Sequence, residues 1–298
     1  MLEKLRSICP DIQENVPLST LTTFRVGGPA ELLAMPETAE QAAALIDFAH
    51  REGLPLCFLG KGSDILAADE GVRGIVLHTA KMATLTANDN GLAAGCGAGL
   101  PAIAQAAARQ GLSGLEWAAG IPGSVGGGVW MNAGAYGGQM SDVVTSVKIY
   151  DGKAMRDITE HGFGYRHSVY MENPNWLILE AGFTLTPDGP EKIQARMDEY
   201  ANARREKQPI DMPSAGSFFK RPPGHFAGAL VEQCGLKGYA VGGAMVSEKH
   251  AGFVVNTGGA ACRDIVALAK HVYETVRRET GAELRPEVRL LGDITWNF

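Results

Sequence analysis

Two polar side chains stand beside aromatic residues, where a hydroxyl or a guanidinium can act on a bound molecule. Ser217 follows Ala-Gly and precedes two phenylalanines, so we expect it to be half-buried. It is either structural or a proton donor in a dry pocket, and without a Gly-x-Ser-x-Gly elbow a hydrolase triad is not favoured. Arg166 follows Tyr165 and either holds a carboxylate through two hydrogen bonds or makes a surface salt bridge, the commoner use of arginine.

An acidic residue and a histidine complete the candidate polar set. Glu287 interrupts the apolar segment 284–292, which predicts a strand. It is either paired with Arg285 or Arg289, which the spacing favours, or poised in a site with a shifted pKa. His250 is a further candidate polar contact, although a lone histidine is more often structural. The seven histidines form no His-x-x-x-His pattern, so we expect no metal site.

The most unusual segment is residues 119–138, here called the glycine stretch. It holds eight glycines, carries no charge and is otherwise small or apolar, so we expect it to be buried or covered. Glycine lets the backbone turn freely and approach a ligand closely, and successive N–H groups can form an anion-binding hollow. The stretch is either a packing corner or a cradle for a phosphorylated cofactor, and the number of glycines favours the cradle.

A second glycine turn, residues 60–64, follows an apolar segment at 54–59 that predicts a buried strand. Ser63 and Asp64 can contact ligand hydroxyls there, and a plain turn is equally supported. This turn is not a P-loop, because Gly62 occupies the hydroxyl position. Residues 95–100 have the wrong last spacing for a Rossmann fingerprint. Nucleotide binding must then come from another architecture, one with more than one glycine loop.

Composition limits the remaining possibilities. The chain has 298 residues, 45% of them hydrophobic and 20% charged, which suits a globular protein of two or three domains. A net charge of −6 without a basic block argues against a nucleic-acid partner. No segment suits a membrane span or a signal peptide, so we expect a cytoplasmic protein. Five scattered cysteines predict reduced thiols rather than disulfides or a metal site.

The elements that must position these residues alternate between short strands and a few helices, which predicts an α+β fold. We expect two strands within residues 20–35 and others at 54–59, 75–78, 92–96, 144–150, 155–158, 176–185, near 244, and at 253–256, with a hairpin at 151–152. We expect helices at 39–50, 102–110, 191–207, 227–233 and 262–279, the first capped by Thr38 and the last ended by Gly281. A domain boundary is expected between 190 and 210.

Several segments together resemble the UDP-N-acetylenolpyruvoylglucosamine reductase (UDP-N-acetylmuramate dehydrogenase) family of bacterial peptidoglycan synthesis. They are residues 15–28, 59–64, 120–127, 131–137, 165–168, 215–220 and 285–288, in the family's order and over nearly the whole chain. The compact length resembles the shorter class, which lacks an extra loop over the substrate.

This resemblance implies an FAD-binding domain of the vanillyl-alcohol-oxidase (PCMH) type and a C-terminal α+β substrate-binding domain. The FAD-binding region would cover residues 1–200, as subdomains of about 1–70 and 71–200. Residues 201–298 would bind substrate, with the extreme C-terminus returning to the FAD region. FAD would be noncovalent, because no histidine stands at 60–64. The implied cofactor-binding residues are Gly60, Lys61, Gly62, Ser63, Asp64, Gly120, Ile121, Pro122, Gly123, Ser124, Gly126, Gly127, Asn132, Ala133 and Gly134. Asp64 replaces the family's usual Asn.

The implied reaction is the NADPH-dependent reduction of UDP-N-acetylenolpyruvoylglucosamine to UDP-N-acetylmuramate through bound FAD. Ser217 would donate the proton, while Arg166 and Glu287 would stabilise an enolate-like species. The implied substrate-binding residues are Tyr165, Lys207, Lys220, Arg221 and His250. We expect a monomer with small-molecule partners and neither nucleic-acid nor membrane partners. The alternatives are another FAD-dependent oxidoreductase of the same fold or an inactive flavin carrier, and the complete catalytic set argues against both.

Overall fold

The structure is a computed structural model that describes residues 1–88 and 90–298. The chain divides into two compact units, each assembled from three stretches of sequence. Unit 1 comprises Met1–Gln13, Leu32–Lys61 and Gly74–Ala203, and unit 2 comprises Glu14–Glu31, Gly62–Arg73 and Arg204–Phe298. Each unit surrounds a hydrophobic core of its own. The expected α+β class is confirmed, while the assignment of whole regions to FAD or substrate stays a prediction.

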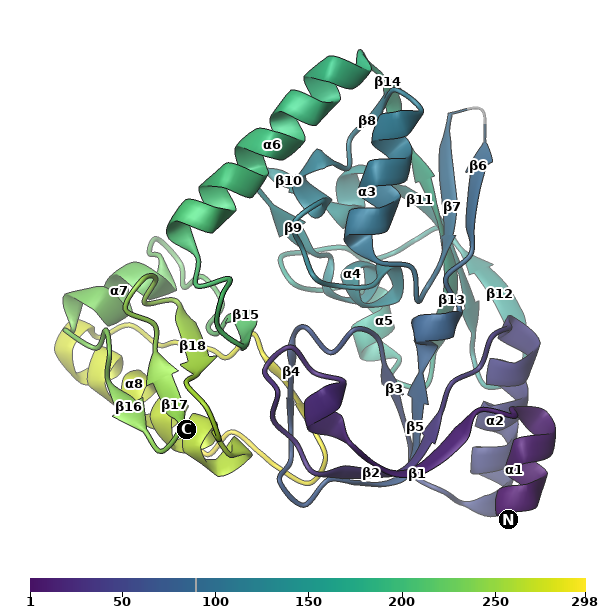
Figure 1. The fold of residues 1–298 in the computed structure, drawn as a ribbon, viewed down its shortest axis with the longest axis horizontal. Coiled ribbons are helices and arrows are strands. Elements are labelled where there is room, and N and C mark those ends of the chain that lie inside the picture. Colours follow the sequence, from purple (N-terminus) through teal and green to yellow (C-terminus); the bar gives the residue numbers. More distant parts are fainter. Residues whose placement is uncertain (89) are drawn as a thin grey trace. The chain divides into compact units, whose positions relative to one another are not determined.

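Unit 1 is built on an antiparallel five-stranded sheet in the order β12-β11-β13-β7-β6. Its strands are Met155–Ile158, Val144–Tyr150, Leu177–Thr184, Gly91–Gly95 and Leu85–Asn88. The helices are α1 (Leu2–Ile8), α2 (Ala39–Glu52), α3 (Leu100–Arg109), α4 (Val125–Met131) and α5 (Val169–Glu172). Figure 1 shows α3 beside β7 and α1 beside α2, and these pairs are in contact. Helix α6 (Pro190–Lys207) begins in unit 1 and ends in unit 2.

A second sheet has the order β1-β2-β5-β3, and its strands are Ile12–Pro17, Pro29–Ala34, Val72–His78 and Leu56–Leu59. Strands β1, β2 and β5 each continue from one unit into the other. Two short pairs complete unit 1, β8 (Leu112–Ser113) with β14 (Thr186–Pro187) and β9 (Gly134–Ala135) with β10 (Gly138–Gln139). Short 3-10 helices occupy Leu18–Thr20, Thr79–Lys81, Glu116–Ala118 and Met140–Asp142.

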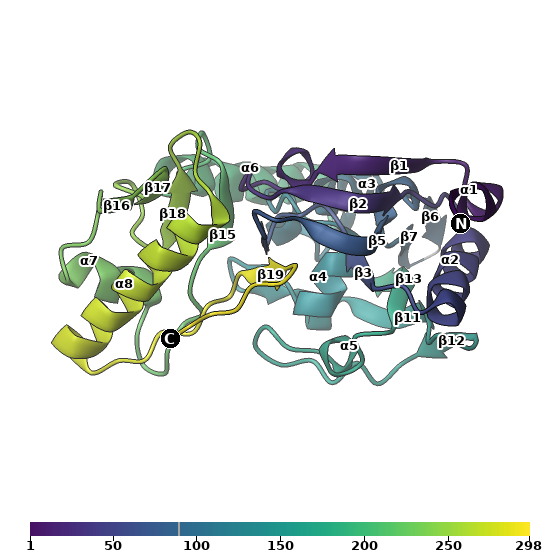
Figure 2. The same ribbon diagram turned by 90° about the horizontal axis from the view of Figure 1, so that it is seen from below.

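Unit 2 has a four-stranded sheet in the order β15-β18-β17-β16, formed by Ser214–Ser217, Phe253–Asn256, Ala244–Val246 and Ala240–Val241. Helix α8 (Cys262–Thr280) lies against β16 and β17, as Figure 2 shows, and α7 (Ala227–Gln233) packs on α8. A short parallel pair joins β4 (Ile65–Ala67) to β19 (Arg289–Leu291).

The long helices form where the sequence supplies caps and an apolar stripe. Thr38 caps α2 by accepting a hydrogen bond from the Gln41 N–H, and Gly53 ends it with a φ of +64°. Helix α8 buries one face at helical spacing and ends at Gly281. The carboxylate of Asp69 accepts hydrogen bonds from the first two amides of α8, at 2.7 and 3.1 Å. The expected helices and the hairpin at 151–152 are confirmed.

Three expectations about local structure are wrong. Residues 20–26 form a 3-10 turn and an irregular segment rather than a strand, because Leu18 and Ser19 hydrogen bond to the carbonyls of Gly28 and Gly27 and close a loop. Strand β3 begins only at Leu56, and Leu59 alone is buried in it. The glycine stretch is covered only in part, because Pro122 and Gly127 are exposed while α4, a helix that was not predicted, buries its Val125 and Val129.

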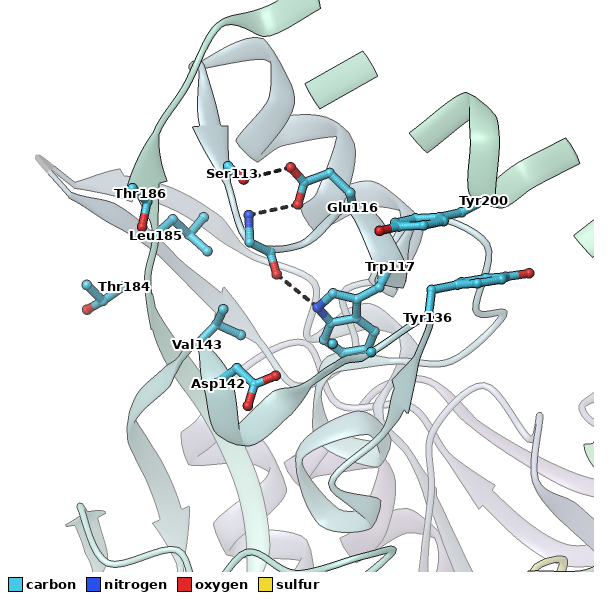
Figure 3. A pocket seen from close by; sticks show the side chains of 13 residues that line it. Ser113, Glu116, Trp117, Tyr136, Asp142, Val143, Thr184, Leu185, Thr186 and Tyr200 are labelled. Carbon is cyan, nitrogen blue, oxygen red and sulfur yellow. Dashed lines mark hydrogen bonds between the residues drawn. The ribbon is translucent and has the colours of Figure 1, made fainter. Parts of the chain in front are cut away.

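A buried carboxylate ties residues 113–116 to α6 in unit 1. Glu116 is 7% exposed and accepts hydrogen bonds from Ser113 Oγ and the Gly114 N–H, both at 2.8 Å, and from Arg196 at 2.7 Å. Figure 3 shows the first two of these contacts. Arg196 also bonds Asp188 at 2.7 Å. Burial alone would raise the pKa of Glu116, but the hydrogen bonds, led by that from Arg196, hold it below its ordinary value.

We expect the substitution Arg196→Met to destabilise the protein, because it leaves a buried carboxylate without its cation. The loss at neutral pH is about 2 kcal/mol, the order of a hydrogen bond to a charged group. A carboxylate whose pKa is lowered by folding stabilises the folded state above its unfolded pKa, near 4.5, and this stabilisation is lost as the pH falls through the folded pKa. The difference in the free energy of unfolding between Arg196→Met and wild type should therefore shrink as the pH falls below the unfolded pKa of Glu116.

Urea denaturation of both proteins across this pH range measures the effect. The exposed Arg109 is the control, since Arg109→Met removes an equal charge from a helix surface and should change stability little. A loss for Arg196→Met that is constant with pH would contradict the ionic origin.

Candidate active site

The two glycine-containing segments meet in unit 1. Strand β3 ends at Leu59, and the buried His78 ring hydrogen bonds to the backbone of the next residue, Gly60. A Cβ added at Gly60 would lie only 2.4 Å from Ser124 Oγ. The exposed Lys61 extends alongside Gly99, where an added Cβ would lie 3.2 Å from its Cε. The predicted cofactor residues Gly60 and Ser124, 64 positions apart in sequence, are thus neighbours in space.

Helix α4 anchors the glycine stretch. Ser124 caps the helix by accepting from the Gly127 N–H at 3.4 Å, and the amides of Val125 and Gly126 donate at 2.8 Å to carbonyls of the segment that connects β7 to α3. A Cβ at Gly126 would lie 2.9 Å from the Cβ of Cys96. Packing on Cys96 therefore favours glycine at 126, and the role of Gly126 in cofactor binding stays a prediction.

The remaining cofactor candidates of the glycine stretch differ in exposure. Gly123 is buried and its carbonyl accepts from the Leu100 amide, Ile121 is partly buried, and Gly120 and Pro122 are exposed. At the far end of α4, Ala133 exchanges backbone hydrogen bonds with Gly128 and Met140. Residues 120, 122 and 127 of the segment are thus exposed, while its buried residues are hydrogen-bonded to the rest of unit 1.

The ionisable groups beneath this region are kept neutral. Burial raises the pKa of the Cys96 thiol to about 12. Burial also lowers the pKa of His78, against the opposing effect of its hydrogen bond to Gly60. A neutral thiol and a neutral imidazole leave the exposed Lys61 as a charged side chain next to the contact between Gly60 and Ser124.

Arg166 lies against the end of α4. Its guanidinium donates to the backbone carbonyls of Asn132, at 3.4 Å, and Gly134, at 3.1 Å. It occupies a tight turn closed by two hydrogen bonds between Gly164 and His167, with a φ of +52°. Such a φ is uncommon for a residue other than glycine and marks a place worth functional interest. The predicted catalytic arginine therefore adjoins three predicted cofactor residues, 132–134.

In unit 2 the serine and glutamate candidates are brought together by the backbone of Phe218. The Phe218 amide donates to the Gly252 carbonyl, and its carbonyl accepts from the Glu287 amide, both at 2.8 Å. Ser217, the residue before it, pairs with Phe253 across the sheet. The side chain of Phe218 is 1% exposed, so a buried anchor holds both candidate residues in place.

Two expectations about these residues are wrong. Ser217 is exposed rather than half-buried, because the bulge at Gly216, with a φ of +75°, turns Ala215 and Phe218 into the core and the serine outward. Glu287 does not interrupt a strand, since β19 begins only at Arg289. Glu287 is partly buried in the extended segment that precedes it.

The second half of the 60–64 turn belongs to unit 2. Gly62 has a φ of +59°, and an added Cβ would lie 2.2 Å from the Leu21 carbonyl oxygen, so only glycine fits. Ser63 and Asp64 are partly buried, and the Asp64 carbonyl accepts from the Arg289 amide at 2.9 Å. This turn therefore lies beside the segment that carries Glu287.

The predicted substrate-binding residues lie in both units. Tyr165, 56% exposed, has its ring centroid 5.3 Å from the Arg166 guanidinium. Lys207 is exposed at the end of α6. The Lys220 amide donates to the Arg285 carbonyl, and the Arg221 guanidinium lies over the Phe226 ring at 4.4 Å. His250 Nδ1 accepts from the Gly252 amide at 3.1 Å, and burial lowers the pKa of this imidazole.

A hollow that contains none of the predicted site residues lies elsewhere in unit 1. Its volume is about 400 Å³, and it is bordered by the stacked rings of Tyr136 and Tyr200, whose centroids are 4.6 Å apart. Figure 3 shows Trp117 and Asp142 at its wall. In the described parts of the chain, 1–88 and 90–298, no group of three or more His, Cys, Asp or Glu could hold a metal ion. Within the same residues no helix is long and apolar enough to cross a membrane.

Comparison with known proteins identifies the family. An FAD binding domain model matches residues 30–155, and a model of the UDP-N-acetylenolpyruvoylglucosamine reductase C-terminal domain matches residues 208–291. The reductase of Caldanaerobacter subterraneus subsp. tengcongensis is 40% identical, with 98% of each chain covered. That of Listeria monocytogenes is 44% identical, with 95% of each covered. The chain belongs to the UDP-N-acetylenolpyruvoylglucosamine reductase family.

A solved reductase agrees with this assignment. The crystal structure of UDP-N-acetylenolpyruvylglucosamine reductase from Thermus caldophilus superposes with a TM-score of 0.80 at 38% identity, over 94% of this chain and 99% of the other. The expected family and its FAD-binding and C-terminal domains are therefore confirmed. The roles of individual residues, and the convergence of Arg166 with Ser217 and Glu287 on one cavity, stay predictions.

We expect Gly60→Ala to reduce the amount of FAD bound, because the new methyl group would force apart the two segments that meet at Gly60 and Ser124. The ratio of flavin to protein absorbance after purification measures occupancy. The double variant Gly60→Ala/Ser124→Ala separates two causes. Without the hydroxyl, the nearest atom of residue 124 lies 3.5 Å from the added methyl, an ordinary contact.

If the double variant binds as much FAD as Ser124→Ala alone, the loss in Gly60→Ala is due to the steric contact with the Ser124 hydroxyl. Continued loss assigns it to the methyl group occupying space that FAD needs. Full occupancy in Gly60→Ala itself would contradict the role of this turn in cofactor binding.

Proposed function

We propose that this chain catalyses the NADPH-dependent reduction of UDP-N-acetylenolpyruvoylglucosamine to UDP-N-acetylmuramate in peptidoglycan precursor synthesis. The observation that carries the proposal is similarity to reductases of this name at 40–44% identity over 95–98% of the chain. Arg166, Ser217 and Glu287 all fall within the segments that carry the resemblance.

The residues around the glycine segments suit FAD. The Ser124 hydroxyl lies so close to Gly60 that a Cβ would not fit there, and glycine leaves the main chain at this turn open to close approach by a ligand. The cofactor would be held by Gly60, Lys61, Gly62, Ser63, Asp64 and residues 120–127. When bound, FAD supplies the redox chemistry that connects NADPH to the substrate.

Arg166 would recognise the carboxylate of the enolpyruvyl group. A guanidinium is always charged and presents its donors in a fixed planar fork, the geometry that matches a carboxylate. Two backbone carbonyls already fix its orientation, which lowers the entropic cost of holding the substrate in register. Charge that develops on the carboxylate during reduction would be stabilised by this preorganised cation.

Ser217 would donate the proton that completes the product. The Oγ–H bond breaks, a C–H bond forms at the alpha carbon of the substrate, and the serine recovers its proton from solvent. Glu287 would lie on the same side of the site, since both residues flank the Phe218 backbone. Lys207, Lys220, Arg221, Tyr165 and His250 would contact the nucleotide.

The setting of the reaction follows from its reagents. NADPH and a UDP-sugar are cytoplasmic metabolites, and all five cysteines are free thiols, which suits a reducing compartment. A net charge of −6 without a basic block supports the absence of a nucleic-acid partner. We propose a monomeric cytoplasmic enzyme without a membrane partner.

Replacing Ser217 by Ala should separate the two halves of the reaction. Reduction of the bound flavin by NADPH should stay close to wild type, because the serine has no part in it. Reoxidation by the enolpyruvyl nucleotide should slow by roughly 10²–10⁴-fold, the usual contribution of a positioned proton donor. Stopped-flow absorbance of the flavin band follows each half separately.

Ser214→Ala is the matched control, because it removes a hydroxyl from the other end of the same strand. Equal slowing of both half-reactions by Ser217→Ala would count against proton donation. No reoxidation of the wild-type flavin by this nucleotide would reject the proposed function itself.

A further inference from the structure

Asn132 holds a position in unit 1 that flavin binding does not explain. It ends helix α4 with a φ of +44° and is 2% exposed. Its side chain is taken up by the protein itself. Oδ1 accepts from the Ser141 amide at 2.9 Å, and Nδ2 donates to the Gly164 carbonyl at 2.9 Å and towards Gln139 at 3.4 Å. An amide with these partners has little capacity left for a cofactor.

The hydrogen bond from Asn132 to the Gly164 carbonyl contacts the turn that carries Arg166, the predicted catalytic arginine. Gly164 opens the tight turn that carries Arg166, and the turn is closed by hydrogen bonds between Gly164 and His167. The Asn132 carboxamide therefore holds the start of the turn from which the Arg166 side chain extends. This contact bridges 32 positions of sequence, so local structure alone would not create it.

The main-chain carbonyl of Asn132 contacts the guanidinium of Arg166. The Asn132 carbonyl accepts from Arg166 Nη1 at 3.4 Å, and the Gly134 carbonyl accepts from Nη2 at 3.1 Å. These carbonyls face the guanidinium because residue 132 adopts the left-handed conformation, which asparagine tolerates better than most residues. One residue thus contacts both the turn and the guanidinium of Arg166.

We propose that Asn132 is a positioning residue that holds Arg166 for recognition of the substrate carboxylate. The inference rests on the proposed function and adds a residue to its machinery. Asn132 need not touch substrate or FAD. Glycine at 132 would keep the left-handed backbone and lose the carboxamide, whereas aspartate would keep the shape and lose the donor to Gly164.

The test compares two nucleotides that differ in the group Arg166 would recognise. UDP-N-acetylmuramate carries the carboxylate, and UDP-N-acetylglucosamine lacks it. We expect Asn132→Gly to weaken binding of UDP-N-acetylmuramate by roughly 10–100-fold, the scale of a misplaced binding group, and to leave UDP-N-acetylglucosamine affinity within about twofold. Isothermal titration of the FAD-containing protein measures both affinities. Asn132→Asp should show the same selectivity, and it serves if the glycine variant does not fold.

A double-mutant cycle tests whether the effect acts through the arginine. If Asn132 works by holding Arg166, then Asn132→Gly should add little to the loss already caused by Arg166→Lys. Ser141→Ala is the control at the same contact. It removes a neighbouring hydroxyl but keeps the backbone N–H that bonds Asn132, so both affinities should match wild type.

Three outcomes for the Asn132 variants would overturn the proposal. They are equal weakening for both nucleotides, additive losses in the cycle, and wild-type affinity for UDP-N-acetylmuramate in both Asn132 variants. These results are distinct from failure of the proposed function, which would show as no turnover of the enolpyruvyl nucleotide by wild type. Binding of UDP-N-acetylmuramate that is normal in Arg166→Lys would likewise reject the role of the arginine, and with it that of Asn132.

Discussion

The backbone of Phe218 exchanges hydrogen bonds with two segments far from it in sequence, and the candidate residues of unit 2 depend on that exchange. Ser217 precedes this residue, Glu287 donates its amide to it, and Gly252 accepts from it next to His250. The phenylalanine ring packs edge-on against Phe219 and Trp296. A reactive side chain on an irregular segment holds its place only if the backbone polar groups around it are satisfied, and here a buried aromatic residue ensures this.

In unit 1 a polar residue, Asn132, satisfies backbone polar groups around a candidate site residue. Asn132 stands at the end of a seven-residue helix whose start is capped by Ser124. A helix of that length spans about 10 Å, so α4 separates the contact of Ser124 with Gly60 from the contacts of residues 132 and 134 with Arg166. Burial keeps Cys96, which packs on Gly126, and His78, which bonds Gly60, uncharged.

The sequence predicts what periodicity and caps encode, and it misses what long-range contacts impose. Helices 39–52 and 262–280 carry an apolar stripe and a terminal glycine, and both were predicted to within a few residues. Helix α4 was missed because three consecutive glycines disfavour a helix, which here is held by Ser124 and by packing on Cys96. The exposure of Ser217 depends on a bulge that the local sequence pattern does not predict. The left-handed φ of Arg166 has no sequence signature either, because it belongs to an irregular turn closed by hydrogen bonds between Gly164 and His167.

The pairing of β4 with β19 joins residues 65–67 to residues 289–291, and Asp69 caps a helix that begins at Cys262. The residues of each pair are about 190 or more positions apart in sequence. A nascent chain exposes β4 early, and this edge stays unpaired until residues 289–291 have been synthesised. Closing so long a loop is entropically costly and slow, which makes an unpaired strand edge a target for chaperones during synthesis. Unit 2 therefore cannot complete its structure until residues 289–291 have been synthesised.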